Sequence, residues 1–296
     1  MLDTYFAPAK INLGLEVLYK RPDGYHEINT LFCRVTEPHD VVTVTRGGFF
    51  QLTCSDKALP TDQRNLMIRA AEGFSQQIGE ALPHFHIHLE KNIPIGAGLG
   101  GGSSDAATML QIMQDWHSSQ LENNRQDTVT SILDRGALLN LAASLGADIP
   151  FFLSGSNAAQ ASGIGEKLRP LAIKLEATVL IVFDSDIQIS TRDAYASLSP
   201  SEEPSAIDYF KFFQSAPPLA KWKEQFGNDF EPEIFRRFPQ LAGIKHSLYT
   251  HGASFALMSG SGSSVYGLFE KREAAQNAKL FFEGKGQLAF LSSPSL

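Results

Sequence analysis

The chain lacks the features that define several protein classes. Its 296 residues include only two cysteines, Cys33 and Cys54, too few for a disulfide framework and without metal-ligand spacing. The longest mostly apolar run, Ala177 to Phe183, is far shorter than the ~20 residues of a membrane span. No basic region followed by an apolar core opens the chain, so we expect no signal peptide. These absences favour a cytoplasmic protein without membrane attachment.

Positive charge is also scarce. The formal net charge is -7 at pH 7, which disfavours non-specific binding to nucleic acid or to anionic lipid. Any bound polyphosphate must therefore be held by local donors. The length allows two hydrophobic cores or one large core. No apolar interaction stripe is evident, so we expect a monomer or a weak homodimer.

Glycine, by contrast, is concentrated in one stretch. Lys91 to Ala107 reads K-N-I-P-I-G-A-G-L-G-G-G-S-S-D-A-A and lies between a strand-like and a helix-like run. Glycines allow positive φ and bring backbone amides close to a ligand. The Ser-Ser-Asp sequence that follows can cap the next helix, whose N-terminus attracts anions. This stretch predicts a phosphate-binding loop.

Other interpretations of this loop fit less well. A Walker loop needs a lysine beside the serine, and none is present. The Gly-x-Gly-x-x-Gly match from Gly96 to Gly101 lacks the N-terminal βαβ unit of a dinucleotide fold. A flexible linker is disfavoured by the apolar Ile93, Ile95 and Leu99 and by the helix that follows.

The residues before this loop predict a mostly antiparallel sheet. Alternation from Ile11 to Val17 places Lys10 and Asn12 on one face of a strand. A turn follows, with Tyr25 and His26 just beyond it. Further strand-like runs cover 30–35, 41–45 and 49–54, and a helix capped by Asn65 covers 65–74.

A strand over 84–89 places three histidines, His84, His86 and His88, on one face. They could bind a metal, but a solvated face is the simpler interpretation because no carboxylate or cysteine stands nearby.

Helices are expected over 106–116 and 131–145, and loops over 118–127 and 199–205. Asp148 follows the second helix, and Ile149-Pro150 should hold the chain extended there. Asp148 is either a site carboxylate or a turn-forming residue.

The second half predicts a hairpin around 163–165, a buried strand over 177–183 and a helix over 193–198 that carries Tyr195. A helix over 231–249, interrupted at Pro239, precedes two strands within 253–269, a helix over 273–282 and a strand over 287–291. This order suggests a split βαβ sandwich. The Ser-Gly run from Ser259 to Ser264 could be only a hairpin turn.

Six stretches in order along nearly the whole chain resemble the GHMP small-molecule kinases. They are A-P-A-K-I-N-L-G-L at 7–15, R-P-D-G-Y-H at 21–26, G-L-G-G-G-S-S-D-A-A at 98–107, L-G-A-D-I-P-F-F at 145–152, N-D-F-E-P at 228–232 and M-S-G-S-G-S-S-V at 258–265. Two stretches depart from the family pattern. Residues 155–160 replace a more regular run that starts with Gly-Gly in the family, and residues 200–228 have no recognised counterpart.

The resemblance implies an α+β fold of two domains. An ATP-binding domain over 1–155 would resemble ribosomal protein S5 domain 2, and a domain over 156–296 would be ferredoxin-like, with the active site between them. It also implies transfer of the ATP γ-phosphate, with Mg²⁺, to the 2-hydroxyl of a CDP-linked methylerythritol in non-mevalonate isoprenoid synthesis.

The resemblance assigns roles to matching positions. Lys10 and Asp148 would be catalytic, with Asp148 a general base or an electrostatic anchor. The acceptor substrate would be held by Asn12, Tyr25, His26, Thr191 and Tyr195. The nucleotide would contact Asn65, Leu66, Lys91, Pro94, Gly96, Gly98, Gly100, Gly101, Gly102, Ser103 and Ser104, with Ser104 also near magnesium. From the residues alone, packing aromatics are the favoured interpretation of Tyr25 and Tyr195, and Lys10 could be a solvated strand charge.

Two rival functions are open at this point. One is a GHMP kinase for another small alcohol, such as homoserine or mevalonate, against which the Asp-Gly-Tyr-His turn and the triple glycine argue. The other is a nucleotide-binding regulator without catalysis, against which the presence of both Lys10 and Asp148 argues.

Overall fold

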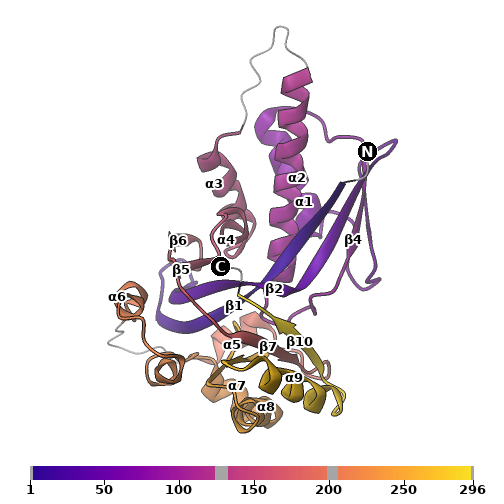
Figure 1. Cartoon of the computed structure of the whole chain (residues 1–296). Coiled ribbons are helices and arrows are strands. Elements are labelled where there is room, and N and C mark those ends of the chain that lie inside the picture. Colours follow the sequence, from indigo (N-terminus) through magenta and orange to yellow (C-terminus); the bar gives the residue numbers. More distant parts are fainter. Residues whose placement is uncertain (1–2, 124–132, 199–205, 295–296) are drawn as a thin grey trace. The chain divides into compact units, whose positions relative to one another are not determined.

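The computed structural model describes residues 3–123, 133–198 and 206–294 (Figure 1). The chain divides into two compact units. Unit 1 comprises Met1–Pro8, His39–Ile93 and Gly100–Gly155, and unit 2 comprises Ala9–Pro38, Pro94–Leu99 and Ser156–Leu296. One transition between units falls between residues 155 and 156. The division into one domain over 1–155 and another over 156–296 stays a prediction.

Unit 1 combines a sheet with a group of helices. Its elements are the first residues of β1 (Asp3–Lys20), the end of β2 (His26–Arg46), β3 (Gln51–Cys54), β4 (Phe85–Glu90), α1 (Leu66–Ile78), α2 (Gly101–Asn123), α3 (Arg135–Leu145) and α4 (Ile149–Leu153). β4 pairs antiparallel with β2 and parallel with β3, so the sheet is not wholly antiparallel. α1 and α2 lie side by side in Figure 1.

Local sequence explains how α1 begins and which face it buries. The Asn65 side chain accepts a hydrogen bond from the amide of Met67 (2.9 Å), as the sequence predicts for an N-cap. Met67, Ala70 and Phe74, spaced by three and four residues, are fully buried. This face supplies part of the unit 1 core.

Unit 2 contains the ferredoxin-like sheet. Its strands β7 (Thr178–Phe183), β8 (Phe255–Met258), β9 (Val265–Phe269) and β10 (Leu288–Ser292) are ordered β10-β7-β9-β8, and all neighbours are antiparallel. The helices between them are α5 (Thr191–Ala196), α6 (Tyr209–Gln214), the 3₁₀ helix η1 (Leu219–Glu224), α7 (Glu231–Arg237), α8 (Pro239–Thr250) and α9 (Arg272–Glu283). The predicted split βαβ order and the interruption at Pro239 are confirmed.

A hairpin of unit 2 adds two strands beside β2. β5 (Ala158–Ser162) and β6 (Lys167–Pro170) are antiparallel, and β5 pairs with Thr30–Cys33 of β2. The predicted hairpin around 163–165 is confirmed.

Three local predictions are wrong. Residues 149–153 form α4 instead of an extended segment, because Pro150 lies in the first helical turn, where its missing N–H has no cost. α2 begins at Gly101, so Ser103, Ser104 and Asp105 lie inside the helix and do not cap it. α2 also continues to Asn123 through the first part of the loop expected over 118–127; the rest of that loop, the loop over 199–205 and residues 131–132 of the predicted third helix lie outside the described residues.

The segment from Tyr209 to Phe226 forms an aromatic cluster. Rings of α6, η1 and the turn after them pack against one another and against Phe255 of β8. The members are Tyr209, Phe212, Phe213, Trp222 and Phe226. The cluster fixes this segment on the ferredoxin-like sheet.

Candidate active site

The glycine loop has the backbone that its sequence predicts. Gly96, Gly98 and Gly100 have φ of +71°, +74° and +74°, which side chains rarely adopt. At Gly98 a Cβ atom would lie 2.1 Å from the carbonyl oxygen of Ser259, so only glycine fits. The loop continues into α2, whose first amides have no acceptor within the helix.

The Ser-Gly run packs on this loop within unit 2. The Ser259 hydroxyl donates to the Gly98 carbonyl (2.9 Å), and the Ser264 amide donates to the Ala97 carbonyl (3.1 Å). The run connects β8 and β9, so it is a hairpin connection and also a support for the glycine loop. A hairpin turn alone therefore does not describe the whole role of this run.

Lys10 and Asn12 lie at the same place. The Lys10 ammonium donates to Asn12 Oδ1 (2.7 Å) and to the Gly98 carbonyl (3.1 Å), and the side chain is almost fully buried. The amide of Gly260 donates to the same Oδ1 atom (2.9 Å). A solvated Lys10 is thus excluded, and a fixed positive charge lies against the glycine loop.

Several residues without an assigned role hold Asn12 and the nearby Ser-Gly run in place. Its Nδ2 donates to the Thr30 hydroxyl (2.8 Å), and the Tyr266 hydroxyl donates to its main-chain carbonyl (2.8 Å). The buried Asn228 amide donates to the carbonyls of Met258 and Gly260 (2.8 Å each). The family-like motif at 228–232 was the one available signal for Asn228.

The aromatic residues predicted to bind the acceptor are partly assembled. The His26 and Tyr195 rings are stacked, with centroids 5.1 Å apart and planes 20° apart. Burial, with a smaller effect of Lys20, lowers the pKa of His26, which therefore offers both a donor and an acceptor near neutral pH. The Tyr25 side chain is 60% exposed, and the Thr191 hydroxyl lies 3.0 Å from that of Ser261.

Unit 1 carries the other predicted site residues. Asn65 and Leu66 begin α1, and Asn65 also donates to the Pro60 carbonyl (2.7 Å). Asp148 is half-buried and directly precedes α4.

The ammonium of Lys91 is engaged inside unit 1. It donates to Asp105 Oδ2 (2.7 Å) and to Asp40 Oδ2, and all three side chains are at least nine-tenths buried. Burial opposes the charge on Lys91, but the two carboxylates outweigh it and raise its pKa. Burial also raises the pKa of Asp105, as does the nearby Asp40, while Lys91 opposes the rise.

The loop region fits a polyphosphate. Ser104 is fully buried in the first turns of α2, and its hydroxyl has no hydrogen-bond partner among the described residues. This free hydroxyl, the glycine backbone and the helix N-terminus are donors suited to phosphate oxygens. Among the same residues, no cluster of His, Cys, Asp or Glu side chains could hold a metal by itself.

The histidines in and next to β4 lie on the solvent side. His84, His86 and His88 are exposed, whereas Ile87 and Leu89 are buried and Phe85 is half-buried. His88 Nδ1 lies 2.9 Å from the Thr53 hydroxyl of the neighbouring β3. The predicted alternation of this strand is confirmed.

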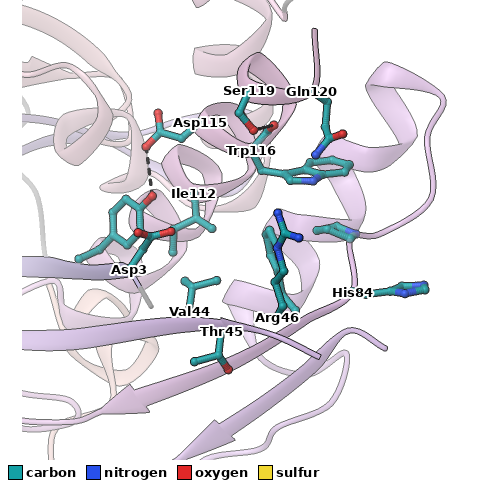
Figure 2. A pocket seen from close by; sticks show the side chains of 13 residues that line it. Asp3, Val44, Thr45, Arg46, His84, Ile112, Asp115, Trp116, Ser119 and Gln120 are labelled. Carbon is teal, nitrogen blue, oxygen red and sulfur yellow. Dashed lines mark hydrogen bonds between the residues drawn. The ribbon is translucent and has the colours of Figure 1, made fainter. Parts of the chain in front are cut away.

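A separate cleft of about 660 Å³ lies in unit 1 between the sheet and α2 (Figure 2). In Figure 2 the Arg46 side chain extends toward Trp116, while His84 points away. Asp115 accepts a hydrogen bond from Tyr5 (3.4 Å). The predicted site residues do not line this cleft, and its exposed charges of both signs favour no class of ligand.

The α+β fold and the glycine loop with its adjacent lysine define a small-molecule kinase of the GHMP type. Residues 65–156 match the model of the GHMP kinases N terminal domain, and residues 211–287 match the GHMP kinases C terminal model. A homoserine kinase from Cytophaga hutchinsonii shares the fold, with a TM-score of 0.65 at 18% identity over 99% of this chain and 95% of that chain.

Closer relatives narrow the class. The 4-diphosphocytidyl-2-C-methyl-D-erythritol kinase of Solidesulfovibrio magneticus is 40% identical over 96% of this chain and 94% of its own length. The kinase of the same name from Parabacteroides distasonis is 37% identical over 96% of this chain and 99% of its own length. A crystal structure of 4-(cytidine 5'-diphospho)-2C-methyl-D-erythritol kinase has a TM-score of 0.78 at 32% identity and covers 98% of both chains. The chain belongs to the 4-diphosphocytidyl-2-C-methyl-D-erythritol kinase family.

No helix in the described ranges is both long and apolar enough to cross a bilayer.

Proposed function

We propose that the protein transfers the γ-phosphate of ATP to the 2-hydroxyl of 4-diphosphocytidyl-2-C-methyl-D-erythritol, giving the 2-phosphate and ADP in the non-mevalonate isoprenoid pathway. The observation that carries this proposal is the 40% identity to a kinase of that name over 96% of the chain. The packing of Lys10 against the glycine loop supports it physically.

Phosphoryl transfer depends on positioning and on neutralising charge. In this proposal the loop from Pro94 to Ser104 holds the phosphates through backbone amides, and the Lys10 ammonium offsets charge beside Gly98. Mg²⁺, when bound, neutralises further phosphate charge, and Ser104 is the hydroxyl proposed near it. Asn65, Leu66 and the Lys91 segment serve the adenine region.

The acceptor is oriented by the remaining site residues. Asn12 is fixed by Thr30 and Gly260 and is proposed to hold the end of the substrate that receives phosphate. Asp148 is proposed to orient the hydroxyl and accept its proton. His26, Tyr25, Tyr195 and Thr191 are proposed to recognise cytosine, by stacking and through a neutral imidazole.

The test is ATP consumption with Mg²⁺ and three acceptors: the cytidine-linked methylerythritol, homoserine and mevalonate. We expect turnover only with the cytidine compound and a loss of about 10²- to 10⁴-fold in Asp148→Ala and Lys10→Met. His86→Ala, on the exposed face of β4, is the control and should retain activity. Turnover of another alcohol would contradict the substrate, and absence of turnover with ATP binding retained would favour a regulator.

We also propose that the protein acts in the cytoplasm as a monomer or weak homodimer. A tight higher oligomer in light scattering would contradict the proposed monomer or weak homodimer.

A further inference from the structure

Asp40 is a buried carboxylate outside every motif of the sequence. It lies in β2, is fully buried, and its Oδ1 atom accepts hydrogen bonds from the amides of Asn92 (2.6 Å) and Ile93 (2.8 Å). Its other oxygen accepts from the Lys91 ammonium. One side chain thus binds three consecutive residues at the point where the chain enters the glycine loop.

The same lysine reaches the exit of the loop. The Lys91 ammonium also donates to Asp105 in the second turn of α2 (2.7 Å). A Cβ atom at Gly101, the first residue of α2, would lie 3.3 Å from this ammonium. The bridge Asp40–Lys91–Asp105 therefore ties the strand end before the loop to the helix start after it.

The charges of this bridge bear on how Lys91 can act. Two carboxylates face one ammonium that is 7% exposed, so its charge is already compensated inside the protein. Such a cation is a poor direct partner for a phosphate, because leaving its carboxylates would strand them in a dry site. Fixing backbone geometry is the role that its contacts support.

We propose that Asp40 is a positioning residue for nucleotide binding, acting through Lys91 and Asp105 to hold both flanks of the glycine loop at a fixed separation. This inference rests on the proposed function. The phosphate-binding amides are effective only when they are pre-aligned, so loosening either flank weakens nucleotide binding before it affects the acceptor.

The test compares Asp40→Asn with Asp115→Asn, a change at an exposed carboxylate that lies on α2, the helix of Asp105, but outside the bridge. The asparagine oxygen can still accept from the two amides, but its NH2 group then faces the Lys91 ammonium and cannot accept from it. We expect the Kd of Mg·ATP, measured by calorimetry without acceptor, to rise about tenfold, with acceptor KM changed less than about twofold. Asp115→Asn should match the parent protein.

Two results would overturn the positioning role: an ATP Kd within about twofold of the parent in folded Asp40→Asn, or an equal rise in ATP and acceptor constants. If Asp40→Asn does not fold, Asp105→Asn replaces it, with an expected rise of about threefold or more in the ATP Kd and the same refuting results.

Amide hydrogen exchange separates this inference from the proposed function. The amides of Asn92 and Ile93 and the first turns of α2 should exchange faster in the bridge variant than in Asp115→Asn, with or without ATP. Equal exchange rates in the bridge variant and in Asp115→Asn would overturn the positioning role of the bridge. Failure of the parent protein to bind ATP overturns the proposed function, and the exchange comparison still decides the bridge.

Discussion

Gly98 offers a sharp test of how the glycine loop and the Ser-Gly run support each other. In Gly98→Ala the new Cβ would lie 2.1 Å from the Ser259 carbonyl oxygen and 3.0 Å from that of Gly262. Gly96 is a matched control because its φ is also positive (+71°) but a Cβ there would meet nothing within 4 Å. The two substitutions share the backbone strain and differ in the close contact.

The magnitude follows from the contacts. Alanine at positive φ costs about 1 kcal/mol, which both variants pay. Relieving the overlap at Gly98 requires the loops to separate by about 1 Å, which breaks the bonds from Ser259 to Gly98 and from Ser264 to Ala97, each worth about 1 kcal/mol. We therefore expect losses in the free energy of unfolding of about 3 kcal/mol for Gly98→Ala and about 1 kcal/mol for Gly96→Ala.

The assay is urea denaturation followed by tryptophan fluorescence. The chain has two tryptophans, of which Trp116 belongs to unit 1 and Trp222 to unit 2. In a Trp116→Phe background, Trp222 reports on the unit that contains Gly98 and Ser259. Equal losses in the two alanine variants would refute the argument, because the close approach would then be able to relax without cost.

Three further predictions concern buried polar groups. Asn228→Ala should lower the free energy of unfolding by about 2–3 kcal/mol in the same assay, because two carbonyls lose their donor, and a loss below about 1 kcal/mol would contradict this. Tyr266→Phe should cost about 1 kcal/mol and reduce turnover, since its hydroxyl supports the Asn12 backbone; unchanged stability and turnover would show that this bond has no role. Burial chiefly raises the pKa of Asp105 to about 7, so the folded protein retains a proton that the unfolded chain releases from about pH 4. The free energy of unfolding should therefore fall from about pH 4 to 7, by at most about 1.4 kcal/mol per pH unit, as measured by urea denaturation at each pH. An equally steep fall in Asp105→Asn would assign the effect to other groups.

Sequence patterns predicted the elements that depend on neighbouring residues. The cap at Asn65, the alternation of β4 and the helix break at Pro239 follow from local chemistry that tertiary contacts did not override. The glycine loop was equally readable, because positive φ at Gly96 and Gly98 needs glycine.

What could not be predicted depends on contacts between distant residues or on ambiguous signals. Asp40 and Lys91 are 51 residues apart, and nothing in their local sequence links them. Pro150 fits the first turn of a helix as well as an extended chain, so its sequence signal was ambiguous. The aromatic cluster around Trp222 has no regular spacing that would mark it as packed against β8.

The interleaving of the two units has a consequence for the gene. The chain passes from one unit to the other at residues 8–9, 38–39, 93–94, 99–100 and 155–156. No single cut therefore yields a fragment that consists of one unit alone and whole. Recombination that exchanges the half after residue 155 would divide unit 2, because residues 9–38 and 94–99 of that unit would still come from the other parent. New variants of this kinase are therefore expected to arise by point substitution more readily than by modular exchange.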